Sequence, residues 1–223
     1  MRFRALLLAT FALLPLAAAA EDAPPPSSPA QRALFETPHL ASIRAPQELD
    51  YAFRREEEGK PAVEDRITMD VRTAEADGRH DVYPEFLSGE RRIGYPPALG
   101  FHGNPLLMYV LDRDTRELAA ATGGSTMWFR MRIRAALAQR ATLRDLPAGD
   151  ATGAGPATEV AITPFEGEAR AKRYQQRRYV FTLAEAVPGG IAEIRTILPG
   201  GDGPAGAEPT VTETVSFAGV RQP

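Results

Sequence analysis

The sequence predicts an α+β domain in which a pair of helices packs over one face of an antiparallel sheet. Two regions, 48–87 and 158–220, alternate apolar and polar residues with the period of β-strands. Between them, residues 104–140 carry helix signals. Because the helices are grouped between two runs of strands, the order favours an α+β fold over a parallel α/β fold, whose strands and helices alternate.

A targeting segment is expected at the N-terminus, at 1–20. Two arginines precede a short apolar run that ends in four alanines, and an acidic pair follows. This pattern is typical of a secretory signal peptide, cleaved here near Ala20, with an uncleaved anchor as the alternative. Residues 21–31 are rich in Pro and Ser and predict a disordered linker, so that 32–223 form a single domain. We expect that domain in the periplasm.

Composition excludes several classes of function. The chain has no cysteine, which excludes disulfides, thiolate catalysis and lipid attachment through a cysteine at the cleavage site. Its net charge of −3 argues against binding to nucleic acid, which requires a strong basic excess. No segment after the leader is apolar for long enough to cross a bilayer, so no integral membrane segment is expected after signal cleavage.

Three strands are expected before the helices, at 48–55, 66–73 and 82–87. In each of them apolar residues alternate with polar ones, and a charged or glycine-containing turn separates it from the next. Short turns join antiparallel neighbours, so these strands predict a meander with one face in solvent.

The middle of the chain predicts a helical hairpin over 104–140. Asn104 caps the first helix, Pro105 lies in its first turn, and Gly123 or Gly124 ends it in the left-handed conformation. Its apolar face is expected to hold Leu107, Val110, Leu111, Leu118 and Ala121. Two pairs of opposite charge four residues apart are expected on its surface, namely Asp112 with Arg116 and Arg113 with Glu117.

Residues 125–134 fit two structures. As a strand, Phe129, Met131 and Ile133 alternate with arginines. As a helix, Ser125 is the N-cap and the alanines that follow continue the helix. We prefer the helix, because only the helix accounts for the alanine-rich segment.

Four further strands are expected after the helices. They are 158–165, 177–187, 191–198 and 210–220, and the glycine-rich segments 146–157 and 199–209 are expected to be loops.

No motif for catalysis or metal binding is complete. The three histidines, His39, His80 and His102, lack partners at metal-ligand spacing, so neither a metal nor another cofactor is predicted. Ser125 lies in Gly-Gly-Ser-Thr-Met, which lacks the second glycine of a Gly-x-Ser-x-Gly nucleophile elbow. A hydrolase that uses Ser125 and a histidine is therefore the least favoured function.

The start of the second predicted helix is a candidate anion-binding site. Its backbone N–H groups lie at the positive end of a helix dipole, with two arginines one and two turns further on. The site would consist of Gly123, Gly124, Ser125, Arg130 and Arg134. The alternative is that both arginines pair with acids of the preceding helix, such as Asp112 or Glu117, and that Trp128 belongs to the core.

The order of elements resembles that of the LolA/LolB-like periplasmic lipid carriers. Residues 31–43 correspond to the first helix of that family, 48–87 to its early strands and 104–140 to its lid helices. The resemblance implies a sheet curved into a half-barrel and a hydrophobic groove beneath the helices. It is one of architecture alone, so it carries over no functional residue, and the cysteine of LolB-like proteins is absent.

We therefore expect a non-enzymatic protein that carries or senses a lipid-like or apolar ligand. Met108, Trp128, Phe129 and Met131 are the candidate lining residues, although such side chains at helical spacing more often belong to a core. A second hypothesis is an adaptor that binds a protein of an envelope complex through its sheet edges or its N-terminal arm.

Overall fold

The computed structural model describes residues 26–74, 77–147, 155–203 and 206–222. The expected signal peptide lies outside these residues. Across the ranges just given, no helix is both long enough and apolar enough to cross a membrane.

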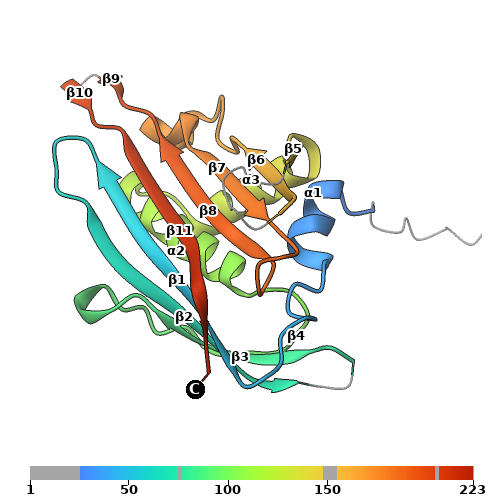
Figure 1. Ribbon diagram of the computed structural model, residues 1–223. Helices are drawn as coiled ribbons and strands as arrows, with labels where there is room; N and C mark the ends of the chain where they lie inside the picture. The colour runs from blue at the N-terminus through green and yellow to red at the C-terminus, as the bar shows by residue number, and fades with distance from the viewer. Residues whose placement is uncertain (1–25, 75–76, 148–154, 204–205, 223) are drawn as a thin grey trace, which may run out of the picture.

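Nine strands form one curved antiparallel sheet that remains open (Figure 1). Their order across the sheet is β4 (Ala98–Phe101), β3 (His80–Phe86), β2 (Val63–Ala74), β1 (Gln47–Glu57), β11 (Val211–Arg221), β8 (Ile191–Leu198), β7 (Arg178–Leu183), β6 (Ala157–Ile162) and β5 (Thr142–Leu146). The early and late strands meet where β1 pairs with β11, from Glu48 opposite Arg221 to Glu57 opposite Val211. The first and the last long strand of the chain are therefore neighbours in the middle of the open sheet.

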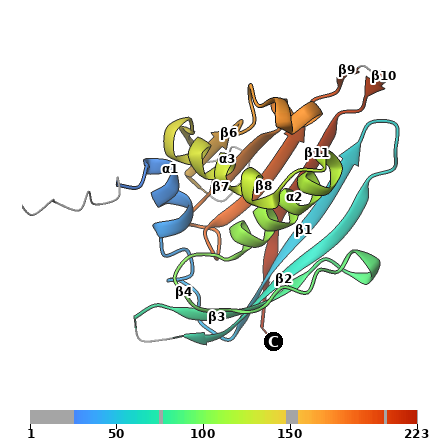
Figure 2. The same cartoon turned by 180° about the vertical axis from the view of Figure 1, so that it is seen from behind.

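Two helices cover one face of this sheet, as Figure 2 shows from the helix side. They are α2 (Leu106–Thr122) and α3 (Thr126–Gln139). Gly123 joins them with φ +69°, the left-handed conformation that glycine adopts without a steric cost. The predicted helical hairpin and the predicted fold class, an α+β curved sheet with helices over one face, are confirmed, and 126–139 is a helix, not a strand.

The main core lies between the sheet and these helices. Leu49, Tyr51 and Ile67 on the sheet and Leu107 and Phe129 on the helices are all at most 1% exposed. These strand residues follow the predicted alternation, because successive side chains of a strand point to opposite faces. The apolar face of the sheet therefore selects which surface the helices cover.

The N-terminal segment corrects one expectation. The predicted disordered linker 21–31 ends earlier, because α1 (Pro29–Gln31) is a capped helical turn that continues into η1 (Arg32–Glu36). Ser28 accepts a hydrogen bond from the N–H of Gln31, and the Gln31 side chain accepts one from the N–H of Ser28, which forms a capping box. The Ser28 hydroxyl also donates to the carbonyl of Leu137 and so fixes the segment to α3.

Several short elements were not predicted. They are β4, β5, η2 (Gly89–Arg91), η3 (Ala169–Gln176) and the hairpin of β9 (Gly201–Gly203) with β10 (Gly206–Glu208). Four of the five residues of β5 are exposed, and only Ala171 of η3 is buried. Elements that bury no continuous apolar face leave no periodic signal in the sequence.

Candidate functional site: a charged pocket beneath α2

The face of α2 that meets the sheet changes character along the helix. Leu106, Leu107 and Val110 in the first turns are buried and apolar. The next turn buries Arg113 and Asp114, which are 8% and 2% exposed. Two ionisable residues buried side by side must be paired, because an unpaired buried charge costs several kcal/mol.

Asp114 of α2 is paired with two residues near the start of β7. One of its carboxylate oxygens accepts a hydrogen bond from Arg177 and the other accepts one from the hydroxyl of Tyr179. Burial and the Asp114 carboxylate raise the pKa of Tyr179 well above its ordinary value of 10, so this hydroxyl stays protonated and donates. Arg177 directly precedes β7 and Tyr179 is the second residue of that strand, so Asp114 joins α2 to the start of β7.

Glu213 is the second buried acid and projects from β11. Arg113 donates to both of its oxygens at 3.1 Å, and Arg55 of β1 donates at 2.6 Å. Arg177 lies 3.6 Å away. Burial acts to raise the pKa of Glu213, but the guanidinium groups of Arg113, Arg177 and Arg55 outweigh it and hold the pKa below 4.5. Glu213 is therefore ionised at neutral pH and binds α2 to β1 and β11.

Glu117, one turn after Arg113, completes this ionic cluster. Its carboxylate lies 2.8 Å from Arg113, and its side chain is 46% exposed. Burial raises the pKa of Glu117 above 4.5, Arg113 opposes that rise, and the carboxylates of Glu213 and Asp114 add to it. The structure thus holds Glu117 close to two other acids, where its charged form is disfavoured.

A pocket of about 350 Å³ opens beside the ionic cluster. It is lined by Arg55, Glu57, Asp114, Glu117, Leu118, Ala121, Arg173, Tyr174, Arg177, Leu198 and Val211. Its walls are thus the second half of α2, η3, and the ends of β1, β8 and β11. Lys172 of η3 donates to the carbonyl of Thr122 at 2.6 Å, which ties η3 to the end of α2. Small-molecule sites start at about this volume.

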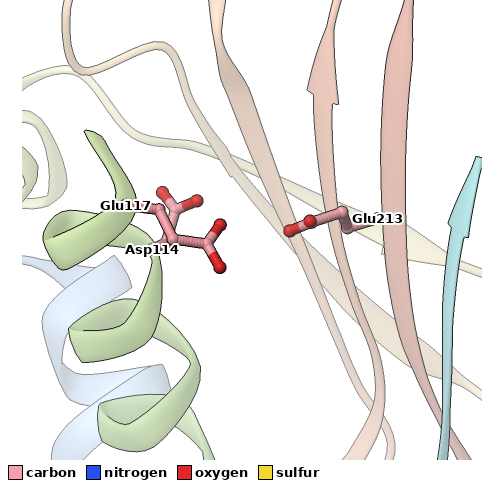
Figure 3. A group of neighbouring side chains, drawn as sticks. All are labelled: Asp114, Glu117 and Glu213. Carbon is pink, nitrogen blue, oxygen red and sulfur yellow. The ribbon is translucent and has the colours of Figure 1, made fainter. Parts of the chain in front are cut away.

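Among the residues that the structure describes, the carboxylates of Asp114, Glu117 and Glu213 form the one group close enough together to be tested as a metal site. They each offer an oxygen within 4.8 Å of the others, and Figure 3 shows Asp114 and Glu117 projecting from α2 toward Glu213 on the sheet. However, Arg113, Arg177 and their neighbours already donate to these oxygens. Guanidinium groups occupy the lone pairs of Asp114 and Glu213 that a metal ion needs, so the three carboxylates do not fit a metal ion.

The four predicted lining residues lie away from this pocket. Met108 and Met131 are 41% and 54% exposed. Phe129 is fully buried in the core, and Trp128 packs on it edge to face, with ring centroids 4.8 Å apart. None of the four lines the charged pocket.

The predicted anion site is divided between structural roles. Gly123 and Gly124 form the turn between the helices. Ser125 is the N-cap of α3 by position, but its side chain makes no capping hydrogen bond. Arg130 pairs with Asp112, which is the arrangement considered as the alternative. Arg134 is exposed and pairs with no residue in the ranges that the structure covers.

The histidines and Ser125 are not brought together as a hydrolase would require. The ring of His39 bonds to the carbonyl of Ala33, and that of His80 bonds to the carbonyl of Thr73. Ser125 is exposed and hydrogen-bonds to neither ring.

The charged pocket was missed by the sequence reasoning, although one signal pointed to it. Asp114 lies four residues after Val110 and four before Leu118, in the centre of the predicted apolar stripe. Arg113 was expected to form a surface pair with Glu117. It does contact Glu117, but it is buried and also reaches Glu213. The residues of η3 and β11 that complete the site carry no signal of their own.

No family model matches the chain, and no curated protein or solved structure matches it either.

Proposed function

We propose that the protein is a non-enzymatic binding protein of the periplasm that carries or senses a small ligand in the charged pocket. The observation that carries this proposal is a pocket of about 350 Å³ between α2, η3 and the sheet, walled by ionisable side chains on separate elements. It lies between helices and sheet, where the resemblance to the LolA/LolB-like carriers places a groove. The charged walls favour a polar ligand over the lipid-like one expected from the sequence.

The architecture supports binding over catalysis. The acids Asp114 and Glu213 are each held by at least two donors, which fixes them as ion-pair partners and leaves neither to exchange protons with a substrate. Ionic and hydrogen-bonding walls select a ligand by its charge pattern, and the few apolar residues between them accommodate its body.

Native mass spectrometry of gently purified protein tests this proposal. The wild type should retain a small molecule, and Ala121→Trp should lose it, because Ala121 lines the pocket and indole fills the space. Ala120→Trp is the matched control, since Ala120 is exposed on the same helix and lies outside the lining.

The identity of the retained molecule separates the alternatives. A polar molecule lost only from Ala121→Trp supports the proposal. A retained phospholipid that Ala121→Trp does not displace would restore the apolar-ligand expectation. Protein without any retained molecule would favour the adaptor hypothesis.

A further inference from the structure

One buried donor in the walls of the charged pocket has no hydrogen-bond partner among the described residues. The Arg177 side chain is 6% exposed, and its Nε finds no hydrogen-bond partner in the structure. Tyr174 and Glu117 line the same pocket. A buried donor without a partner costs about 1–3 kcal/mol, and a ligand that accepts a hydrogen bond from this Nε would remove that cost.

The formal charges of the described lining residues cancel. Three carboxylates, those of Glu57, Asp114 and Glu117, face three guanidinium groups, those of Arg55, Arg173 and Arg177. A ligand with a single charge would therefore meet like charges as well as opposite ones. Such a pocket gives no net attraction to a simple anion or a simple cation.

Both signs occur on more than one wall. Asp114 and Glu117 belong to α2, Arg177 follows η3, and β1 carries both Arg55 and Glu57. Four apolar residues complete the described lining and are called the apolar strip here, namely Leu118, Ala121, Leu198 and Val211. The pocket therefore offers carboxylates, guanidinium groups and apolar side chains within one lining.

We infer that the charged pocket binds a small zwitterion of about the size of a dipeptide. Its ammonium group pairs with Glu117, its carboxylate accepts hydrogen bonds from Arg177 and Tyr174, and its aliphatic part lies on the apolar strip. This inference rests on the proposed function and adds the class of ligand to it.

The electrostatics of Glu117 agree with this assignment. Burial and the nearby carboxylates of Glu213 and Asp114 raise its pKa, while Arg113 and Arg55 oppose the rise. Together these effects disfavour the charged form of Glu117. A ligand ammonium beside the carboxylate favours the ionised form in the complex.

Three related peptides separate the possible charge classes. Alanyl-alanine carries both charges, N-acetyl-alanyl-alanine carries only the carboxylate, and alanyl-alanine amide carries only the ammonium. Isothermal titration calorimetry of the wild-type protein should show that alanyl-alanine binds. Each blocked peptide should bind at least about 10-fold more weakly, because each block removes one charge-assisted contact.

Glu117→Gln locates the ammonium contact. This substitution should weaken the binding of alanyl-alanine by about 10-fold and change the binding of N-acetyl-alanyl-alanine little. Glu56→Gln is the matched control, since Glu56 has the same charge, follows Arg55 in the chain and lies outside the lining, with its side chain 56% exposed. That control should bind all three peptides like the wild type.

Each result of this experiment decides something. If a blocked peptide binds as tightly as alanyl-alanine or more tightly, the inference of a zwitterionic ligand is wrong, whereas the proposed binding function still holds. The same holds if no peptide binds while native mass spectrometry still shows a retained molecule. If nothing is retained and nothing binds, the inference and the proposed function fall together. Because the comparison of peptides uses the wild type, it stands even if a variant fails to fold.

Discussion

The two halves of α2 hold the same helix to the same sheet by different physical means. The first half, with Leu106, Leu107 and Val110, enters the apolar core, and Tyr109 stacks on Tyr95 with ring centroids 4.7 Å apart. The second half buries one apolar residue in the core, Leu118, and is otherwise attached through the ionic cluster of Arg55, Arg113, Asp114, Glu117, Arg177 and Glu213. One helix thus combines a hydrophobic attachment with a polar one.

The difference separates stability from recognition. Apolar burial is non-directional and independent of pH, so the first half serves chiefly to hold the helix in place. Buried ion pairs gain little net free energy, because desolvation offsets the attraction, but they are directional. The second half therefore fixes where charges point, and the pocket lies beside that half.

The largest expected effect comes from breaking the ionic half at one partner. Arg177→Met leaves Asp114 without one of its two donors and should lower the free energy of unfolding by about 3–5 kcal/mol in urea denaturation. Arg178→Met, at a side chain that is 50% exposed, should change it by about 1 kcal/mol or less. Equal effects of the two substitutions would show that the ionic half does not hold α2.

A slightly smaller effect is expected in the apolar half. Leu107→Ala should cost about 3 kcal/mol, from lost burial and the cavity that remains. Met108→Ala is the control, because Met108 is 41% exposed, and it should cost less than about 1 kcal/mol. The loss of unfolding free energy caused by Leu107→Ala should be the same at pH 4 and pH 7. A strong pH dependence would contradict the distinction between an apolar and an ionic half.

The ionic half should respond to acid. The pKa of Glu213 is held below 4.5 in the folded protein, so its ionised form stabilises the fold above that pH, and this stabilisation is lost as the pH falls through the folded value. The stability difference between wild type and Glu213→Gln should accordingly be largest at pH 7 and shrink below about pH 4.5. Thermal unfolding across this range measures it, and a constant difference would contradict the assignment.

The smallest effect, and one of opposite sign, is expected at Glu117. Because its pKa is raised in the fold, its stabilising contribution belongs to the protonated form and is lost as the pH rises above 4.5. Glu117→Gln should therefore raise the melting temperature slightly at pH 7 and leave it unchanged at low pH. A variant that is less stable than wild type at pH 7 would mean that the ion pair with Arg113 dominates.

Much of the fold follows from local patterns. The alternation of Leu49, Tyr51 and Phe53 predicted β1 and the face that it buries, and the glycines at 123–124 predicted the turn between the helices. Edge strands such as β5 and the polar η3 were not predictable, because their residues are ordered by neighbours distant in the chain. The same limit applies to the pocket, whose walls come from five separate elements.

What the sequence by itself determined is the class of the fold and the position of its helices, since periodicity and caps act within a few residues. It did not predict that Asp114 of α2 is buried. Only the tertiary structure decided that Arg177, Tyr179 and Glu213 meet this helix, because Arg177 and Glu213 lie 63 and 100 residues from their α2 partners. A charge that must be paired in the interior does not say from where along the chain its partner comes.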